Sequence, residues 1–189
     1  MRGMQLWLLI GAAAIVAVAG AWWLLGSRDD AMARRDLPGF GQVDVPRRLE
    51  GRQPDVSARI AVFRFDLIAG GFAFMGSITP VRERLVIVAW DRAAGDRVGA
   101  IGEARDLVTE RVEGLRWRVE GNVERGEGTY VVNTRERPSR LTLLVVEAEA
   151  IVIAHRIWVE DSRPDESVEL VRRIAGSFRR DPQRAPSSR

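Results

Sequence analysis

Apolar residues follow two kinds of pattern along this chain: one unbroken run near the N-terminus, and short spaced runs after it. The unbroken run, LWLLIGAAAIVAVAGAWWLL, covers residues 6–25 and contains no charged residue. A helix of about 20 residues spans roughly 30 Å, which is the hydrocarbon thickness of a bilayer. The run therefore predicts a single membrane-spanning helix that anchors the protein.

Tryptophans lie at both ends of this run, with Trp7 at one end and Trp22 and Trp23 at the other. Indole rings favour the two membrane–water interfaces, so we expect these three residues to be the membrane-interface residues. A cleaved signal peptide is an alternative, because Arg2 precedes the run and residues 17–19, Ala-Val-Ala, have the form of a cleavage site. The apolar sequence continues past that site, which favours the anchor. A buried core helix is the third alternative, and cleavage stays open.

The orientation of the anchor also stays open. Arg28, Arg34 and Arg35 follow the run while only Arg2 precedes it, and this count favours a cytoplasmic carboxyl side. Bacterial proteins with one N-terminal helix and a compact domain after it more often export the domain. We therefore expect a protein of the bacterial inner membrane whose domain lies on the periplasmic side.

The remaining patterns divide the chain into four parts. Residues 1–26 form the anchor, 27–55 a proline- and glycine-rich tether, 56–180 the folded domain, and 181–189 a disordered tail. Within the domain, β-branched and aromatic residues alternate with polar ones in several short runs, which predict strands. These strands are expected over 56–68, 72–78, 84–90, 115–123, 129–134, 141–146 and 150–159, with turns at 125–128 and 137–139.

Two segments repeat apolar residues at three- and four-residue steps, which predicts amphipathic helices over 96–113 and 166–179. Asp96 and Asp165 stand at their starts as N-cap residues. The buried stripe of the first helix is expected at Val98, Ile101, Leu107 or Val108, Val112 and Leu115, and that of the second at Val168, Val171, Ile174, Ala175 and Phe178. The predicted fold class is α+β: an N-terminal transmembrane helix followed by an antiparallel sheet packed with two helices.

Composition excludes several classes of function. The 29 basic side chains are all arginine, and they are interleaved with 26 acidic ones to give a net charge of only +3. A nucleic-acid-binding protein more often clusters its basic residues, so no nucleic-acid partner is expected. The chain has no cysteine, which excludes disulfides, cysteine-ligated metals, a cysteine nucleophile and a lipid-modified cysteine.

Candidate chemistry is sparse. His155 is the only histidine, and a metal site or an acid–base site would need partners that no motif supplies, so a hydrogen-bonded or solvated histidine on a strand is expected. The serines that we weighed as nucleophiles lack a nucleophile-elbow motif: Ser57, Ser77, Ser139 and Ser162. Glycines follow no phosphate-binding spacing. We therefore predict no catalytic residue, no metal, no cofactor and no enzymatic activity.

Three tryptophans fall in predicted strands: Trp90, Trp117 and Trp158. We expect them in the core or on a sheet face. Any of them that proves exposed marks a partner surface, because tryptophan and arginine are enriched in binding hot spots.

The order of elements resembles the PsbP-like, Mog-type fold family, which has bacterial envelope members. The resembling features are the helix before Leu115, the strands around 125–130 and the ending ELVRRIAGSF over 169–178. A fainter resemblance, carried by the acidic turn and helix over 165–180, is to periplasmic immunity proteins that neutralise type VI secretion lipase effectors. Neither resemblance implies catalytic residues.

These observations predict a membrane-anchored, non-catalytic domain that acts by protein–protein interaction at the cell envelope. Two alternatives belong to other classes of function. One is an immunity protein that neutralises a secreted toxin, and the other is a module that binds a small ligand or lipid in an apolar cavity.

Overall fold

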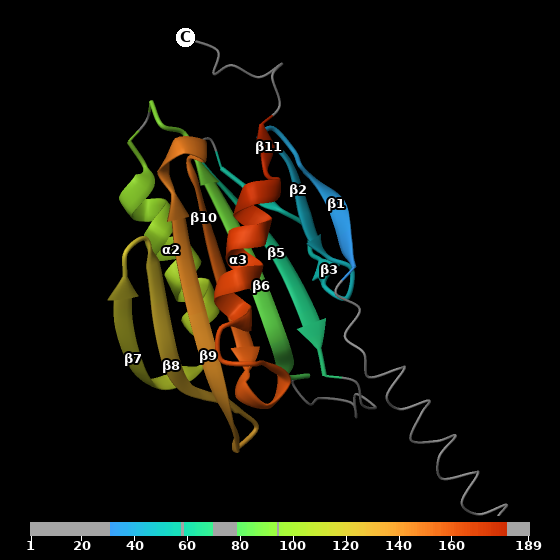
Figure 1. Ribbon diagram of the computed structural model, residues 1–189, viewed down its shortest axis with the longest axis vertical. Helices are drawn as coiled ribbons and strands as arrows, with labels where there is room; N and C mark the ends of the chain where they lie inside the picture. The colour runs from blue at the N-terminus through green and yellow to red at the C-terminus, as the bar shows by residue number, and fades with distance from the viewer. Residues whose placement is uncertain (1–30, 58, 70–78, 94, 181–189) are drawn as a thin grey trace, which may run out of the picture. The chain divides into compact units, whose positions relative to one another are not determined.

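Alternating apolar and polar residues fold most of the chain into strands. The computed structural model describes residues 31–57, 59–69, 79–93 and 95–180. Within this part, a large antiparallel sheet of eight strands has the order β3-β5-β6-β10-β9-β8-β7, with β4 also paired to β5 (Figure 1). The strands are β3 (Glu50–Gly51), β4 (Asp55–Val56), β5 (Ile60–Ile68), β6 (Val81–Trp90), β7 (Val112–Glu120), β8 (Val123–Val132), β9 (Arg135–Val146) and β10 (Ile151–Trp158).

A second sheet has three strands in the order β1-β2-β11: β1 (Met32–Leu37), β2 (Gly41–Pro46) and β11 (Arg179–Arg180). Gly41 sits where β11 joins β2. A Cβ atom at this position would come within 2.1 Å of the carbonyl oxygen of Arg179, and the φ angle of Gly41 is +146°. Only glycine permits this close approach, so β11 is attached to β2 through a position that no other residue fits.

The helices α2 (Arg97–Thr109) and α3 (Glu166–Ser177) lie on opposite faces of the large sheet (Figure 1). Two short 3₁₀ turns, η1 (Glu147–Glu149) and η2 (Val159–Asp161), flank β10. Because successive side chains of a strand point to opposite faces, each strand of the sheet contributes to both layers of core.

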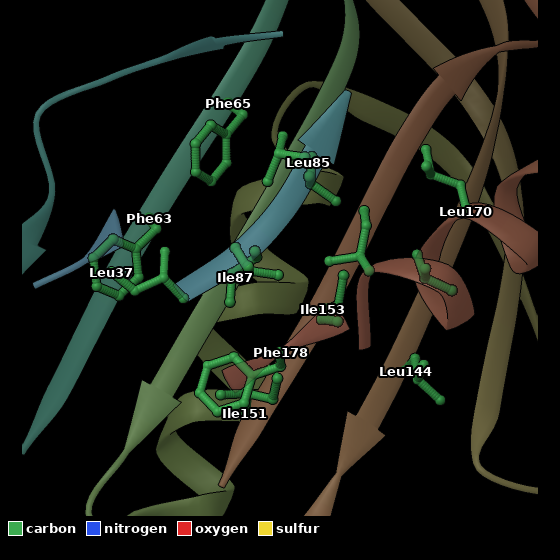
Figure 2. Packing of buried hydrophobic residues seen from close by; sticks show 14 of the residues in the cluster. Leu37, Phe63, Phe65, Leu85, Ile87, Leu144, Ile151, Ile153, Leu170 and Phe178 are labelled. Atoms are coloured by element: carbon green, nitrogen blue, oxygen red, sulfur yellow. The ribbon is translucent and has the colours of Figure 1, made fainter. Parts of the chain in front are cut away.

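The core on the α3 face joins the large sheet to α3 and to the small sheet. Aromatic and aliphatic side chains of β5, β6 and β10 pack there against α3, β1 and β2 (Figure 2). Its buried members include Leu37, Val43, Phe63, Phe65, Leu85, Ile87, Leu144, Ile151, Ile153, Leu170, Ile174 and Phe178.

The core on the α2 face is built differently, because its helix contributes small side chains. Ala100, Ala104 and Val108 are fully buried against the sheet and follow one another at four-residue steps. Small residues let a helix backbone approach a sheet closely, so the large side chains of this layer come from the strands. Val86, Val88, Trp90, Tyr130, Leu141, Leu143 and Val152 are among them.

The two predicted helices had different outcomes. The predicted stripe of α3 is confirmed, since Val168, Val171, Ile174 and Phe178 are buried and Ala175 packs against them. The predicted stripe before β7 is confirmed in part: Val108 and Val112 are buried, and Ile101 and Leu107 pack against the same core. It is wrong at Val98 and Leu115, which are 78% and 36% exposed, and it missed Ala100 and Ala104, which are fully buried. Val112 and Leu115 belong to β7 and not to the helix. Valine is more hydrophobic than alanine, so hydropathy alone predicts that Val98 is buried. The face that packs on the sheet is instead the one whose small side chains let the helix approach it closely.

Neither predicted N-cap forms its side-chain hydrogen bond. Asp96 and Asp165 do stand directly before α2 and α3, yet no cap bond joins either side chain to the helix. Asp165 accepts a hydrogen bond from Arg125 of β8 at 2.7 Å instead. The carboxylate of Asp165, which the sequence predicts to cap α3, is thus bound by a guanidinium group of β8.

Both predicted turns inside the second half of the domain are wrong. Gly126 and Gly128 lie within β8, and Pro138 lies within β9. On one side Pro138 pairs with Thr129 of β8. On its other side no residue of β10 lies opposite it, because the last pair between β9 and β10 is the one at Ser139. A proline that lacks an N–H group fits where a strand has a neighbour on one side only.

The prediction of a tether over 27–55 does not hold for its described residues, 31–55. This stretch carries β1, β2 and β3, and Val43 and Val45 of β2 are fully buried. Proline and glycine suggested a linker, but here Pro38 and Gly39 form the turn between β1 and β2, and the others include Gly41 and Pro46 at the two ends of β2. The predicted strand over 72–78 and the predicted disordered tail over 181–189 lie outside the described residues.

The predicted fold class is corrected at its first element. In residues 31–180, apart from the gaps named above, no helix has the length and apolar character needed to cross a membrane. The two helices contain 13 and 12 residues, or about 20 Å at 1.5 Å per residue, which is short of the roughly 30 Å required. The fold is sheet-rich α+β, and residues 6–25, with Trp7, Trp22 and Trp23, lie outside the described residues.

Candidate functional site

His155 lies at the centre of a buried polar cluster on the α3 face of the sheet. Its Nδ1 atom is 2.6 Å from Oγ of Ser167 on α3, and its Nε2 atom is 3.0 Å from Oε1 of Glu83 on β6. Thr142 of β9 donates to Ser167 Oγ at 2.8 Å, and Arg48 donates to both Glu83 oxygens at 2.8 and 2.9 Å. The prediction that His155 is hydrogen-bonded is confirmed.

The hydrogens of this cluster form one directed chain. With the proton on Nε2 of His155, Thr142 donates to Ser167, Ser167 to His155, and His155 to the carboxylate of Glu83. Burial by itself raises the pKa of Glu83, but the hydrogen bonds that His155 and Arg48 donate to it and the positive charge of Arg48 outweigh burial and lower that pKa to about 2. Glu83 is therefore ionised and fully partnered.

The cluster contains the residue types of a serine hydrolase, but its surroundings do not suit that chemistry. Ser167, His155 and Glu83 are 3%, 1% and 2% exposed. A nucleophile needs a space beside it for a substrate carbonyl, whereas Ser167 is buried and its hydroxyl group is hydrogen-bonded to both Thr142 and His155. The arrangement instead joins α3 to three strands of the sheet, and the network stabilises the domain.

A metal would need further ligands beside His155. In the part of the chain that the structure describes, no group of three or more His, Cys, Asp or Glu residues could hold a metal ion. Glu83 is the one carboxylate that contacts His155 among these residues, and its oxygens are occupied by Arg48.

A second buried ionic cluster lies on the α2 face. Asp66 of β5 accepts from Arg84 of β6 at 2.9 and 3.3 Å and pairs with Arg52 at 2.8 Å. Arg84 also contacts Glu110 and the carbonyl of Leu107, at the end of α2. Arg84 thus donates a hydrogen bond to one of the carbonyl groups at the C-terminal end of α2. The two arginines balance the two carboxylates of the cluster in charge.

Arg156 is the neighbour of this cluster on β10 and is 1% exposed. Its guanidinium carbon lies 3.8 Å from the ring centroid of Tyr130, and one terminal nitrogen donates to the carbonyl of Val81. Burial is the main cause of its lowered pKa, which is about 10. The stacking on Tyr130 compensates in part for the two nitrogen atoms of Arg156 that lack a hydrogen-bond partner.

The three tryptophans of the strands differ in exposure. Trp90 and Trp158 are 5% and 9% exposed and belong to the core on the α2 face. Trp117 of β7 is only partly buried. Trp117 is therefore the least buried of the three, but none of them is exposed, so the tryptophans alone do not mark a partner surface.

Glycines of β8 hold Trp117 in place. A Cβ atom at Gly126 would lie 3.0 Å from the indole ring of Trp117, and one at Gly128 would lie 3.2 Å from Leu115 and 2.5 Å from Val112. Because these positions have no side chains, the side chains of Trp117, Leu115 and Val112 can lie over the backbone of β8. Arg105 of α2 stacks on the other side, with its guanidinium carbon 5.5 Å from the indole centroid.

β7 is the long open edge of the large sheet. Among the described residues it ends the strand order and pairs along one side only, with β8. An edge strand presents unpaired N–H and C=O groups along its outer side. The opposite edge consists of two-residue strands, β3 and β4, that are separated by Pro54, and such interrupted edges are poor templates for pairing.

One face of β7 is apolar. Leu115, Trp117 and Val119 alternate along it on the α2 side of the sheet, and Leu115 and Val119 are 36% and 71% exposed. They are two of the five large hydrophobic residues that are exposed within the described residues. We call these three residues, with the backbone of β7, the β7 edge.

The other face of β7 carries charge. Arg116 and Arg118 are both exposed, and neither forms an ion pair with any residue that the structure describes. Arg118 is directly opposite Arg125 of β8, whose guanidinium group is already paired with Glu120 at 2.9 Å and Asp165 at 2.7 Å. Strand β7 is therefore amphipathic. It carries apolar side chains on one face and, on the other, two arginines that form no ion pair with the described residues.

Sequence reasoning found one part of this surface and missed two. It assigned Leu115, Trp117 and Val119 to one face of a strand, which is confirmed, but it did not place that strand at the edge of a sheet. It read the two glycines of β8 as a turn, although their two-residue spacing matches the spacing of the apolar residues on β7. Ser167 was not among the serines weighed, since nothing local connects it to His155, 12 residues earlier.

Comparison with known proteins adds no relative. No protein-family model matches the chain, and a search of curated proteins finds none that matches.

Proposed function

We propose that this protein is a binding domain that recognises another polypeptide by strand addition at the β7 edge. The observation that carries the proposal is the combination of a nine-residue open edge with exposed apolar side chains along it. In strand addition, backbone hydrogen bonds supply affinity, and alternate side chains supply specificity. The β7 edge offers both, with the half-buried Trp117 at its middle.

The alternative places for a partner are less favourable. The outer strand of the small sheet, β1, has six residues, and its exposed members Arg34 and Asp36 already contact Asp44 and Gln42 of β2. A groove of about 470 Å³ beside the β1–β2 turn is lined by polar side chains, glycines and one proline, with a single buried leucine. Neither offers exposed apolar side chains beside an open backbone.

A photocrosslinking experiment tests the proposal in cells that produce the full chain. A benzophenone amino acid replaces Val119 on β7 or, as the matched control, Val56 on β4 at the opposite edge, which is 55% exposed. We expect a discrete adduct with another polypeptide from position 119 and none from position 56. Mass spectrometry then identifies the crosslinked segment.

In a second design the benzophenone amino acid replaces Leu115, which leaves position 119 free for substitution. Val119→Arg should then abolish the adduct from position 115, because a buried charge would replace an apolar contact. Val56→Arg is the control substitution. Equal adducts from positions 119 and 56, or adducts that survive Val119→Arg, contradict binding at the β7 edge.

The proposal does not depend on the compartment in which the domain lies. The location at the bacterial inner membrane, the periplasmic placement and the two family resemblances stay predictions. The toxin-immunity alternative is a special case of the same binding mode, in which the partner is the toxin.

A further inference from the structure

We infer that the segment recognised at the β7 edge alternates apolar and acidic residues. This inference rests on the proposed function, since it names the chemistry of the partner for that same edge. It follows from what each face of β7 would meet on an added strand. Residues directly opposite on neighbouring strands lie on the same face of the sheet.

The apolar face sets one half of the pattern. An added strand places every second side chain beside Leu115, Trp117 and Val119. Val119 is 71% exposed and Trp117 is partly buried, so apolar residues at these positions of the partner would remove both from water. Polar residues there would be desolvated without a hydrogen-bond partner, at a cost in affinity.

The charged face sets the other half. Arg116 and Arg118 lack ion pairs with described residues. On β8, Arg116 is opposite Glu127, and Arg118 is opposite Arg125, whose guanidinium group is already paired with Glu120 and Asp165. A partner carboxylate beside Arg118 therefore supplies an ion pair that the described residues do not, whereas a partner lysine places a like charge beside it.

The same arginines disfavour a second copy of this chain as the partner. Antiparallel pairing of two β7 strands is most extensive when it is centred on Arg116, the middle residue of the strand. This register places Arg116 opposite Arg116 of the other copy. Charges on an edge strand commonly prevent such self-association.

Three synthetic peptides test the inference on the full chain. Each has ten residues in which valine alternates with glutamate, lysine or threonine. Binding is followed by fluorescence anisotropy, and the site is located by hydrogen–deuterium exchange of the amides over 112–120, with 32–37 of β1 as the reference edge. We expect the glutamate peptide to protect β7 and to bind about three- to tenfold more tightly than the threonine peptide at low salt.

A charge reversal supplies the decisive comparison. In the double variant Arg116→Glu/Arg118→Glu the preference should invert, so that the lysine peptide binds more tightly than the glutamate peptide. The matched control is Arg172→Glu/Arg173→Glu on the exposed face of α3, which changes net charge equally and should keep the original preference. An inverted preference also excludes loss of folding as the explanation.

The outcomes separate the inference from the proposal beneath it. Equal protection of β7 by all three peptides overturns the acidic pattern and leaves strand addition intact. A preference that inverts in the α3 control as well shows that net charge decides binding, and it overturns the inference. No protection of β7 by any peptide overturns strand addition and the inference together.

Discussion

Replacing Glu83 with glutamine tests the physical account of the buried cluster around His155. The carboxylate of Glu83 accepts two hydrogen bonds from Arg48 and one from His155. A glutamine side chain has one acceptor oxygen and one donor nitrogen, so in Glu83→Gln an N–H group would face a donor of Arg48 or His155. The variant also removes the carboxylate charge beside Arg48, whose side chain is only 15% exposed.

The expected magnitude follows from the pKa of Glu83. This pKa is about 2 in the folded protein and 4.5 for an ordinary glutamate, and the difference corresponds to about 3 kcal/mol in the free energy of unfolding. Because the folded-state pKa is lowered, this stabilisation is present above pH 4.5 and is lost as pH falls toward 2. Breaking a buried ion pair at one partner costs about 3–5 kcal/mol in general, which agrees.

Urea unfolding of the full chain, followed by far-UV circular dichroism between pH 7 and pH 2.5, measures the effect. We expect Glu83→Gln to be less stable than the wild type by about 3 kcal/mol at pH 7, and the difference should shrink as the wild-type carboxylate is protonated. Glu113→Gln on β7 is the control, because Glu113 is exposed and a surface change of this kind stays within about 0.5 kcal/mol. A difference that is the same at pH 7 and pH 3 would refute the electrostatic account.

Three further substitutions test the packing and the hydrogen bonds. Ser167→Ala removes the partner of His155 Nδ1 in a buried site and should lower the free energy of unfolding by about 1–3 kcal/mol in chemical denaturation. Gly126→Ala places a methyl group 3.0 Å from the ring of Trp117 and should destabilise by about 1–2 kcal/mol, with a red shift of tryptophan fluorescence as the ring moves toward solvent. Ala104→Leu enlarges the fully buried face of α2 and should lower the thermal midpoint, at a cost of about 1–3 kcal/mol.

Gly102 provides a control for the last two substitutions. It lies on α2, and an added Cβ atom there would meet nothing within 4 Å. Gly102→Ala should stabilise the protein by about 0.4–1 kcal/mol, because alanine favours the helix and loses less backbone entropy on folding. If Gly126→Ala and Gly102→Ala have the same effect, the close contact between β8 and Trp117 is not part of the packing.

Much of the α+β domain could be predicted from periodicity. The strands around 60–68, 84–90, 115–120 and 151–158 are confirmed in kind, as are the helix over 166–177 and its buried stripe. Each has a dense apolar pattern that fits one secondary structure and not the other. Local pattern was sufficient there because burial along one face is what such a pattern encodes.

The wrong predictions of turns, tether and buried helix face depended on how proline, glycine and alanine were interpreted. Pro46 ends β2, Gly126 lies inside β8, and Ala104 faces the core. Proline and glycine disfavour strands, and alanine is only weakly hydrophobic, so none of the three predicts its observed position from the local sequence. Close contact with a neighbouring strand or helix reverses that preference, and the neighbour is distant in the sequence.

By itself, the sequence determined the class of the domain, the alternation of Leu115, Trp117 and Val119 on one face, and the lack of a cysteine or a recognisable catalytic motif. Only the tertiary structure decided that β7 lies at the edge of the sheet and that His155 meets Glu83 and Ser167. The physical reason is that side-chain periodicity reports which face of an element is buried. The order of strands in a sheet, and the partners of a buried polar group, depend on contacts between segments tens of residues apart.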